Sequence, residues 1–233
     1  MKNFLLDLLF PRSCLRCQKL IAHDRRGYMC DKCHEILDVA EDLRCAFCTS
    51  YSPHGLTCNV CKPKHALDRL LVAANYKKKI VERMAKTLKY RFATDVAIDI
   101  ARIIKKRFPR VEVDCLIPIP LHKSRLRWRG FNQAELIASE LSLLWKIPVR
   151  TDLLIRKKST SPQADIKDRN SRIANAKNIF DLVVEPLSKV VQPLGTIILV
   201  DDLSTTGSTL DEAAKVLKLS GVEKVIGVVF ARG

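Results

Sequence analysis

The sequence predicts an α/β fold, in which a parallel sheet flanked by helices follows a small cysteine-rich domain. Two observations lead to this prediction. From residue 66 onward, short apolar runs typical of strands buried on both faces alternate with amphipathic helical patterns. In contrast, eight of the nine cysteines fall within the first 65 residues. We therefore expect a cysteine-rich domain at 1–65 and an α/β domain at 66–233.

The composition of the chain favours an anionic partner. It carries 41 lysines and arginines against 25 aspartates and glutamates, a formal net charge of +16. Such a balance is typical of proteins that bind nucleic acid, phosphorylated substrates or an acidic membrane surface, with a lysine-rich proteome as the alternative explanation. The sequence has no apolar run near the roughly 20 residues that span a bilayer. Phe4–Phe10 is short and contains Asp7, which suits a docking helix better than a signal peptide, so we expect a cytoplasmic protein.

The cysteines of the first domain form four C-x-x-C pairs, Cys14/Cys17, Cys30/Cys33, Cys45/Cys48 and Cys58/Cys61. Each pair places two thiolates on one tight turn, which suits tetrahedral Zn²⁺ better than disulfides in the cytosol. We therefore expect two structural zinc sites, which would supply much of the folding energy of so small a domain. Sequential pairing (first with second, third with fourth) and alternating pairing (first with third, second with fourth) both remain open. We expect the nearby histidines to lie beside these sites or in solvent, not to bind the metal: His23, His34, His54 and His65.

The first half of the α/β domain reads as strand, two helices and a second strand. Leu67–Tyr76 is apolar enough for a strand, and Lys78–Tyr90 and Asp95–Phe108 show helical periodicity with basic outer faces. Those faces could bind nucleic acid or simply be solvated. Val113–Pro118 is a buried strand in which Cys115 is expected to be a small core residue.

A cationic stretch follows this strand. Leu121 and His122 lead into four cations within seven residues, Lys123, Arg125, Arg127 and Arg129. Cations at the carboxyl end of a strand indicate a loop for a polyanion, with an ordinary surface turn as the alternative. Asn132 is a good N-cap for a helix that runs to Trp145.

The next segments are a strand, a polar connection and another strand. Leu153–Arg156 and Ile179–Val184 have strand composition. Between them, Lys157–Lys177 is polar and basic, which is consistent with a functional mobile loop or with a plain connector.

The stretch Gly195–Thr209 is the most informative part of the chain. Thr196–Val200 reads as a strand buried on both faces, and Asp201 and Asp202 follow where it would leave the sheet. A hydroxyl-rich turn then opens a helix that ends at Ser220-Gly221, and Lys224–Phe230 reads as a further strand. The sequence therefore predicts a βαβ unit with carboxylates and hydroxyls at its ligand-binding end.

These residue types suggest a phosphorylated sugar as ligand. The backbone N–H groups of Thr205–Thr209, at the start of a helix, form a nest for phosphate. Asp201 and Asp202 would repel that phosphate, so they suit sugar hydroxyls or a hard cation. Phosphate, diol and Mg²⁺ together suggest a ribose 5-phosphate with a second phosphate group, whereas a structural strand–turn–helix is the alternative reading.

Three motifs resemble known proteins. VDDLSTTGST resembles the phosphoribosyl pyrophosphate (PRPP) loop of type I phosphoribosyltransferases. P-x-P-x-H followed by RGFNQA, and a Q-x(5)-R-x-x-R-x-x-N segment, resemble the ComF family, whose members carry an N-terminal zinc finger and a phosphoribosyltransferase domain. The resemblance implies a PRPP/Mg²⁺ site at Asp201, Asp202, Ser204, Thr205, Thr206, Gly207, Ser208 and Thr209. It also implies a pyrophosphate loop at Leu121, His122, Lys123, Arg125, Arg127 and Arg129, and a loop closing over the substrate at Gln163, Arg169, Arg172 and Asn175.

The family is associated with natural transformation, so the resemblance implies a role with incoming single-stranded DNA, at or near the cytoplasmic side of the inner membrane. Three hypotheses follow. The protein binds single-stranded DNA and uses PRPP as a ligand, with Trp128, Phe131 or Tyr90 stacking on bases. Alternatively, it is an active phosphoribosyltransferase with Asp201 and Asp202 as catalytic residues and an acceptor that the sequence does not specify. In the third, it is a PRPP-sensing adaptor that docks other DNA-uptake proteins through the zinc domain; the sequence leaves the oligomeric state open.

Overall fold

The computed structural model describes residues 11–22, 24–37, 42–90, 93–157, 179–183 and 195–233. Within these residues, the main sheet has four parallel strands in the order β1 (Arg69–Asn75), β6 (Lys224–Arg232), β5 (Thr196–Ser204) and β2 (Cys115–Pro118). Two short strands, β3 (Leu154–Arg156) and β4 (Phe180–Leu182), pair antiparallel beside the sheet. The predicted α/β fold with a parallel sheet is confirmed.

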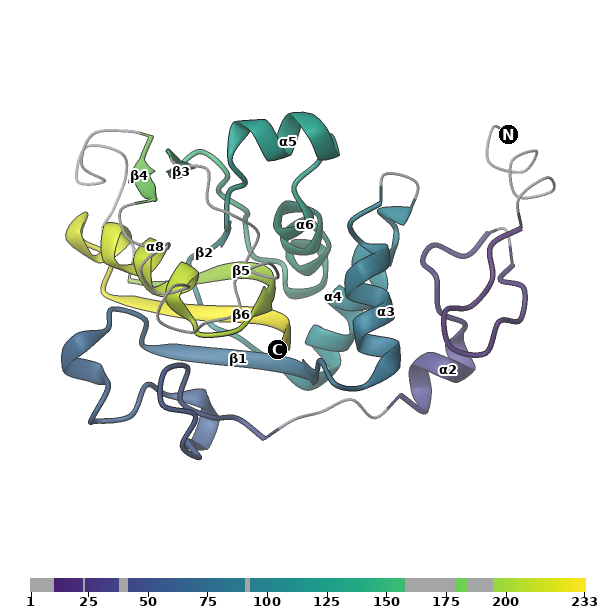
Figure 1. Cartoon of the computed structure of the whole chain (residues 1–233), viewed down its shortest axis with the longest axis horizontal. Helices are drawn as coiled ribbons and strands as arrows, with labels where there is room; N and C mark the ends of the chain where they lie inside the picture. The colour runs from purple at the N-terminus through teal and green to yellow at the C-terminus, as the bar shows by residue number, and fades with distance from the viewer. Residues whose placement is uncertain (1–10, 23, 38–41, 91–92, 158–178, 184–194) are drawn as a thin grey trace.

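Helices cover both faces of this sheet (Figure 1). One face carries α3 (Lys79–Thr87), α4 (Val96–Arg107) and α6 (Gln133–Trp145), and the other carries α8 (Ser208–Leu219) together with β3 and β4. Successive residues of a strand point to opposite faces, so Ile198 packs under α4 and α6 whereas Leu199 packs under α8. Burial on both sides explains the uninterrupted apolar runs of the sequence.

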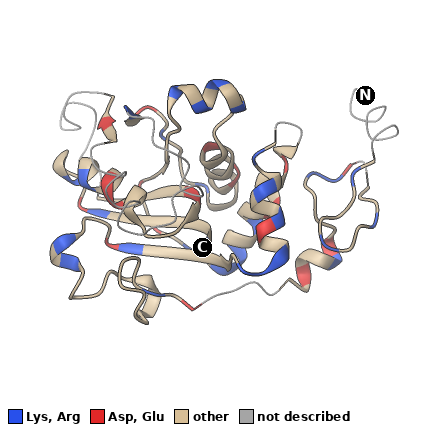
Figure 2. Ribbon diagram, in the orientation of Figure 1, with Lys and Arg blue, Asp and Glu red and all other residues tan. Residues whose placement is uncertain are grey.

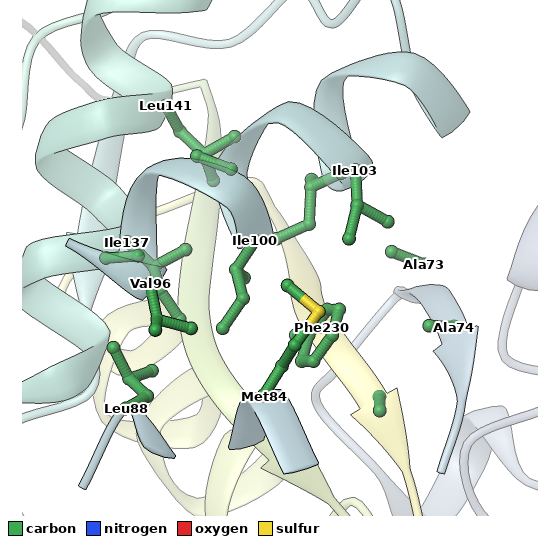
Figure 3. Packing of buried hydrophobic residues seen from close by; sticks show 14 of the residues in the cluster. Ala73, Ala74, Met84, Leu88, Val96, Ile100, Ile103, Ile137, Leu141 and Phe230 are labelled. Carbon is green, nitrogen blue, oxygen red and sulfur yellow. The ribbon is translucent and has the colours of Figure 1, made fainter. Parts of the chain in front are cut away.

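The larger core lies beneath α3, α4 and α6 (Figure 3). Phe230 of β6 shares this core with Met84 of α3, with Leu88 just after that helix, and with residues of α4 and α6, namely Val96, Ile100, Ile137 and Leu141. Phe230 is fully buried, so it anchors the helical layer to the centre of the sheet.

The βαβ unit β5–α8–β6 forms as predicted. Gly221 adopts a φ of +103° just after the Ser220 cap of α8, where the left-handed region favours glycine. At the other end of the helix, Gly207 is the N-cap with a φ of +76°. Asn132 caps α6, because its side chain accepts a hydrogen bond from the Ala134 N–H at 3.1 Å.

Two predictions about local structure are wrong. The strand β5 does not end at Val200 but continues to Ser204, because it stays paired with β6 as far as Arg232. The acidic pair therefore lies within the strand. The cationic stretch is not a loop but a short helix, α5 (Lys123–Arg129), which begins after a side-chain cap from His122 to the Ser124 N–H and ends at Gly130.

The cysteine-rich part consists of two modules that pack on opposite faces of the sheet. The first module is residues 11–37, which include α2 (Asp31–Glu35), and the second is residues 42–65, which include the 3-10 turns Pro53–Gly55 and Lys62–Lys64. Met29 of the first module is buried in the core beneath α3 and α4. Phe47 of the second module is buried in the core beneath α8. Each face of the sheet is thus completed by one module.

Backbone and side-chain hydrogen bonds hold each module in place. In the first, the Tyr28 N–H donates to the buried Asp99 carboxylate of α4 at 2.5 Å, and burial raises the pKa of Asp99 to about 6. In the second, Leu56 forms an antiparallel bridge to Arg69 on the outer edge of β1. The proposed boundary at residue 65 stays a prediction. None of the helices in the described part of the chain is both long and apolar enough to cross a bilayer, and Phe4–Phe10 lies outside that part.

Candidate ligand site and metal centres

The acidic pair lies near the carboxyl end of β5, a central strand of the sheet. Because the two residues are adjacent, their side chains point to opposite faces. Asp202 is buried, and its Oδ1 accepts a hydrogen bond from Gln133 Nε2 of α6 at 3.3 Å. Asp201 is half-buried, and its Oδ1 accepts from the Asp202 N–H at 2.8 Å. The pair therefore presents carboxylates on both sides of one strand end.

One carboxylate oxygen of this pair accepts no hydrogen bond from the described residues. Oδ2 of Asp202 is buried and has no hydrogen-bond partner among the described residues. Burial and the neighbouring negative charge of Asp202 raise the pKa of Asp201 well above the usual carboxyl range. A buried acceptor without a partner costs about 1–3 kcal/mol, and a ligand hydroxyl or a hydrated cation would recover part of that cost. The donor set therefore fits sugar hydroxyls and Mg²⁺, which prefers carboxylate oxygens.

Arg129 is linked to the acidic pair through Gln133, and Arg156 experiences the charge of Asp201. Arg129 donates to Gln133 Oε1 at 2.5 Å, so α5, α6 and β5 are joined by a relay from Arg129 through Gln133 to Asp202. Burial lowers the pKa of Arg129 and of Arg156, and the positive charge of Arg125 lowers both further. The carboxylates act in the opposite direction: the negative charge of Asp202 raises the pKa of Arg129, and that of Asp201 raises the pKa of Arg156.

Arg156 is the site residue that sequence reasoning missed. It ends the short strand β3, and its guanidinium lies over the Phe180 ring of β4, 5.7 Å from the ring centroid. The available signal was a single arginine at the end of a predicted strand, which is also common on protein surfaces. Only the pairing of β3 with β4 next to β5 gives that arginine a role.

The hydroxyl-rich turn forms an open hollow beside Asp201. The hollow has an empty volume of ≈ 180 Å³ and is lined by Asp201 and residues 203–210. The hydroxyls of Thr206 and Ser208 lie 2.8 Å apart at its floor, next to the N-terminus of α8. The structure thus brings Asp201 together with the predicted phosphate residues Ser204, Thr205, Thr206, Gly207, Ser208 and Thr209.

The predicted pyrophosphate residues divide between two faces of α5. Arg125 and Arg129 are half-buried, and Arg129 is linked to Asp202 through Gln133, whereas Lys123 and Arg127 are exposed. His122 serves as the cap of the helix, and Leu121 precedes it half-buried. The four residues predicted to close over the ligand lie outside the described residues: Gln163, Arg169, Arg172 and Asn175.

The cysteines form two clusters by sequential pairing. Cys14, Cys17, Cys30 and Cys33 make one cluster, and Cys45, Cys48, Cys58 and Cys61 make the other, each with its sulfur atoms within 4.8 Å of one another. Four thiolates at about 2.3 Å from a tetrahedral zinc lie about 3.8 Å apart. The Sγ–Sγ distances of 3.8 Å in the first cluster (Cys17–Cys30) and 3.5 Å in the second (Cys48–Cys58) fit this geometry. Alternating pairing is excluded, because the clusters belong to modules on opposite faces of the sheet.

The remaining cysteine and the histidines play other parts. Cys115 of β2 is buried in the core beneath α8, which confirms that it is a core residue, and this burial raises the pKa of its thiol to about 11. His65 faces Asp211 with Nδ1 2.8 Å from the carboxylate, and His34 lies 4.0 Å from Asp99. Neither belongs to a four-cysteine cluster, as predicted, and His23 lies outside the described residues.

Comparison with known proteins places the chain in a family. A double zinc ribbon domain model matches residues 5–62. Competence protein F of Haemophilus influenzae is 30% identical over 231 residues, which cover 93% of this chain and 95% of that protein. DNA utilization protein YhgH of Escherichia coli O157:H7 is 27% identical over 94% of this chain and 96% of its own length, and competence protein ComFC of Bacillus subtilis is 37% identical over 46% and 39%, respectively. The chain therefore belongs to the ComF family of competence proteins, with a double zinc ribbon at its N-terminus.

Proposed function

We propose that this protein binds PRPP together with Mg²⁺ and acts in DNA uptake. The observation that supports this ligand is the acidic pair on β5, which is followed directly by the hollow turn and linked through Gln133 to Arg129 of α5. Each part matches one part of PRPP. The phosphate is offered N–H groups and hydroxyls, the diol is offered carboxylate acceptors, and the pyrophosphate is offered cations.

The residues divide the ligand as follows. Backbone N–H groups and hydroxyls of residues 204–209 hold the 5-phosphate. Asp201 and Asp202 accept hydrogen bonds from the ribose hydroxyls, and the unpartnered Oδ2 of Asp202 is the oxygen best placed to hold a hydrated Mg²⁺. Arg125 and Arg129 face the pyrophosphate, with the exposed Lys123 and Arg127 on the same helix adding positive charge.

The proposal is tested by calorimetric titration of the zinc-loaded protein with PRPP in the presence and absence of Mg²⁺. We expect saturable binding that is stronger with Mg²⁺, because the cation offsets repulsion between the pyrophosphate and the acidic pair. Ribose without phosphates serves as the control ligand. Absence of PRPP binding under both conditions would refute the site.

The DNA role is supported by the named relatives and by charge. Relatives are named for competence and for DNA utilization, and the chain carries a net charge of +16. Lysines and arginines are frequent along α3 and α5 (Figure 2). On α3 and at its two ends, exposed side chains are those of Lys77 (before the helix), Lys79 and Lys89 (after it). We propose that this face binds single-stranded DNA on the cytoplasmic side of the membrane.

Exposed aromatic rings accompany these cations. Tyr90, just after α3, is 67% exposed, and Trp128 of α5 is 76% exposed. Exposed rings beside cations are typical of surfaces that stack on unpaired bases. Phe131 is half-buried, so it is the weakest of the three predicted stacking residues. Fluorescence anisotropy with labelled single-stranded and duplex oligonucleotides tests the proposal, and equal affinity for both would contradict it.

A phosphoribosyltransferase activity is the second candidate. The arginines that face the acidic pair would stabilise a departing pyrophosphate, and the two carboxylates would stabilise positive charge at the ribose C1. Pyrophosphate release on addition of nitrogenous acceptors would establish this activity. PRPP binding without release on any acceptor would favour a binding module.

A further inference from the structure

The second cysteine module lies directly against the hollow turn. Gly207 is so close to it that a Cβ on this residue would lie 3.3 Å from Ala46 Cβ and 3.3 Å from Phe47 Cε1. Ala46 and Phe47 are the two residues between Cys45 and Cys48, so they form the tip of a metal-binding turn. Ala46 is fully buried and Phe47 is 6% exposed. The proposed phosphate turn thus packs, at Gly207, against the C-x-x-C turn of Cys45 and Cys48.

A second contact fixes this metal-binding turn to the strand end. Arg232 of β6 pairs in register with Ser204, the last residue of β5. Its guanidinium donates to the Cys45 carbonyl at 3.2 Å and to the Ala46 carbonyl at 2.6 Å. The contact is charge-assisted, and it joins the strand beside the hollow to the backbone of the cysteine turn.

A third set of contacts holds the start of α8. Asp211, in the first turn of the helix, is 3% exposed. Its Oδ1 accepts from the Ala66 N–H at 2.7 Å and the Leu67 N–H at 3.1 Å, and its Oδ2 faces His65 Nδ1 at 2.8 Å. The His65 ring in turn stacks on the Phe47 ring, with centroids 3.4 Å apart. The hollow turn is therefore held on both sides, at Gly207 by Phe47 and at Asp211 by the end of the module.

We propose that the second module is a working part of the phosphate site, with Phe47 as a positioning residue that keeps residues 204–209 in the conformation that binds the 5-phosphate. The inference rests on the proposed PRPP function. It predicts that ligand affinity depends on metal in the second cysteine cluster and not on metal in the first, which packs on the other face of the sheet. If the turn without this support adopts its binding conformation a tenth of the time, affinity falls about tenfold.

The effect should be confined to one half of the ligand. The second module contacts the phosphate turn, whereas the pyrophosphate is proposed to bind Arg125 and Arg129 of α5 on the other side of the acidic pair. Weakened support for the turn should therefore lower affinity for ribose 5-phosphate and leave affinity for magnesium pyrophosphate unchanged. A general loss of stability would lower both.

The chain offers matched controls. Phe47→Ala in the second module is compared with Met29→Ala in the first, since both remove a buried side chain from the module's core contact. Cys48→Ser/Cys58→Ser is compared with Cys17→Ser/Cys30→Ser, because each double variant removes one exposed and one half-buried cysteine of its cluster. Phe47→Tyr keeps the ring and should restore binding. Phe47→Leu replaces Phe47→Ala if the latter fails to fold.

The experiment is calorimetric titration of each folded, zinc-quantified variant with PRPP/Mg²⁺, ribose 5-phosphate and magnesium pyrophosphate. We expect ribose 5-phosphate affinity to fall about tenfold or more in the second-module variants and to change less than about twofold in the first-module variants. Equal losses in both modules, equal losses for both half-ligands, or no loss in Phe47→Ala would each overturn this inference while leaving the PRPP site intact. Failure of the wild-type protein to bind PRPP would remove the proposed function itself, and this inference with it.

Discussion

Gln133 Nε2 donates to Asp202 Oδ1 across 3.3 Å, and this bond ties the first residue of α6 to a strand at the centre of the sheet. Gln133 also accepts from Arg129, so one amide side chain positions a cation and a carboxylate together. Because it is only 7% exposed, the amide has little water to replace either partner. Asp202 and Arg129 are thus connected through one buried side chain.

Replacing the Gln133 amide should break the connection between Arg129 and Asp202. Gln133→Leu keeps the side-chain volume but removes both hydrogen bonds, and loss of a hydrogen bond to a charged group costs about 1.5–3 kcal/mol. We expect PRPP affinity measured by calorimetry to fall about tenfold or more. Ser139→Ala, at an exposed position of the same helix, is the control. Unchanged affinity in Gln133→Leu would mean that the relay does not shape the site.

The ionised Asp201 carboxylate should lower the folding stability of the protein at neutral pH. Its pKa is raised in the folded chain, so the folded state holds the proton to a higher pH than the unfolded state does. Folding stability from this group is therefore complete below the unfolded pKa of about 4 and decreases as pH rises toward the folded pKa. Asp201→Asn cannot ionise, so the variant does not lose this stability as pH rises. Its melting temperature should therefore exceed that of the wild type at pH 7, and the difference should shrink toward pH 4.

The same substitution should damage the ligand site. Asp201→Asn is expected to weaken PRPP binding, and the double variant Asp201→Ala/Asp202→Ala should abolish it without unfolding the protein. Thermal melts across pH and calorimetry at pH 7 are the two measurements. A variant that is less stable than the wild type at pH 7, yet binds PRPP normally, would contradict both parts of the prediction.

Metal removal should destabilise the whole chain. Purified protein is expected to contain two zinc ions, one in each cluster of four cysteines. Structural zinc contributes about 10–16 kcal/mol of apparent binding free energy in isolated zinc-finger peptides. Since Met29 and Phe47 belong to the cores on the two faces of the sheet, chelation should lower the melting temperature of the α/β domain as well. Cys115→Ala should retain both ions, and a melting temperature unaffected by chelation would argue against this coupling.

DNA binding should depend on the basic surface of α3. Each phosphate neutralised on a single strand contributes about −0.7 to the slope of log K against log salt concentration. The triple variant Lys77→Ala/Lys79→Ala/Lys89→Ala should therefore make the slope shallower by about 2. Lys62→Ala/Lys64→Ala, which removes exposed lysines of the second module, is the control. Equal slopes in the wild type and the triple variant would place the DNA elsewhere.

Local patterns were sufficient to predict the elements that are buried on both faces. The apolar run Thr196–Val200 and the Ser220-Gly221 stop predict the β5–α8–β6 unit, since a strand between two helical layers has no solvent face to encode. The four C-x-x-C pairs likewise predict metal binding, because ligand spacing is a local property. Their pairing is not local, since it depends on which face of the sheet each module covers.

Elements that depend on tertiary contacts could not be predicted. The helix α5 has no apolar stripe: its half-buried cations are Arg125 and Arg129, and Arg129 is held by Gln133 and not by a hydrophobic core. A pattern of cations therefore reads as a loop. Similarly, the extension of β5 through Asp202 to Ser204 depends on pairing with β6, and the role of Arg156 depends on where β3 lies.

The strand order has a consequence for how the chain is assembled. The first two strands along the chain, β1 and β2, lie at opposite edges of the four-stranded sheet and are not paired with each other. β5 and β6, about 80 residues or more beyond β2, fill the space between them. No two neighbouring strands of this sheet can therefore pair until β5 emerges from the ribosome. Until then, the apolar faces of helices α3 and α4 have no sheet to pack against. Early zinc binding by the two modules would give the incomplete chain its first folded structure.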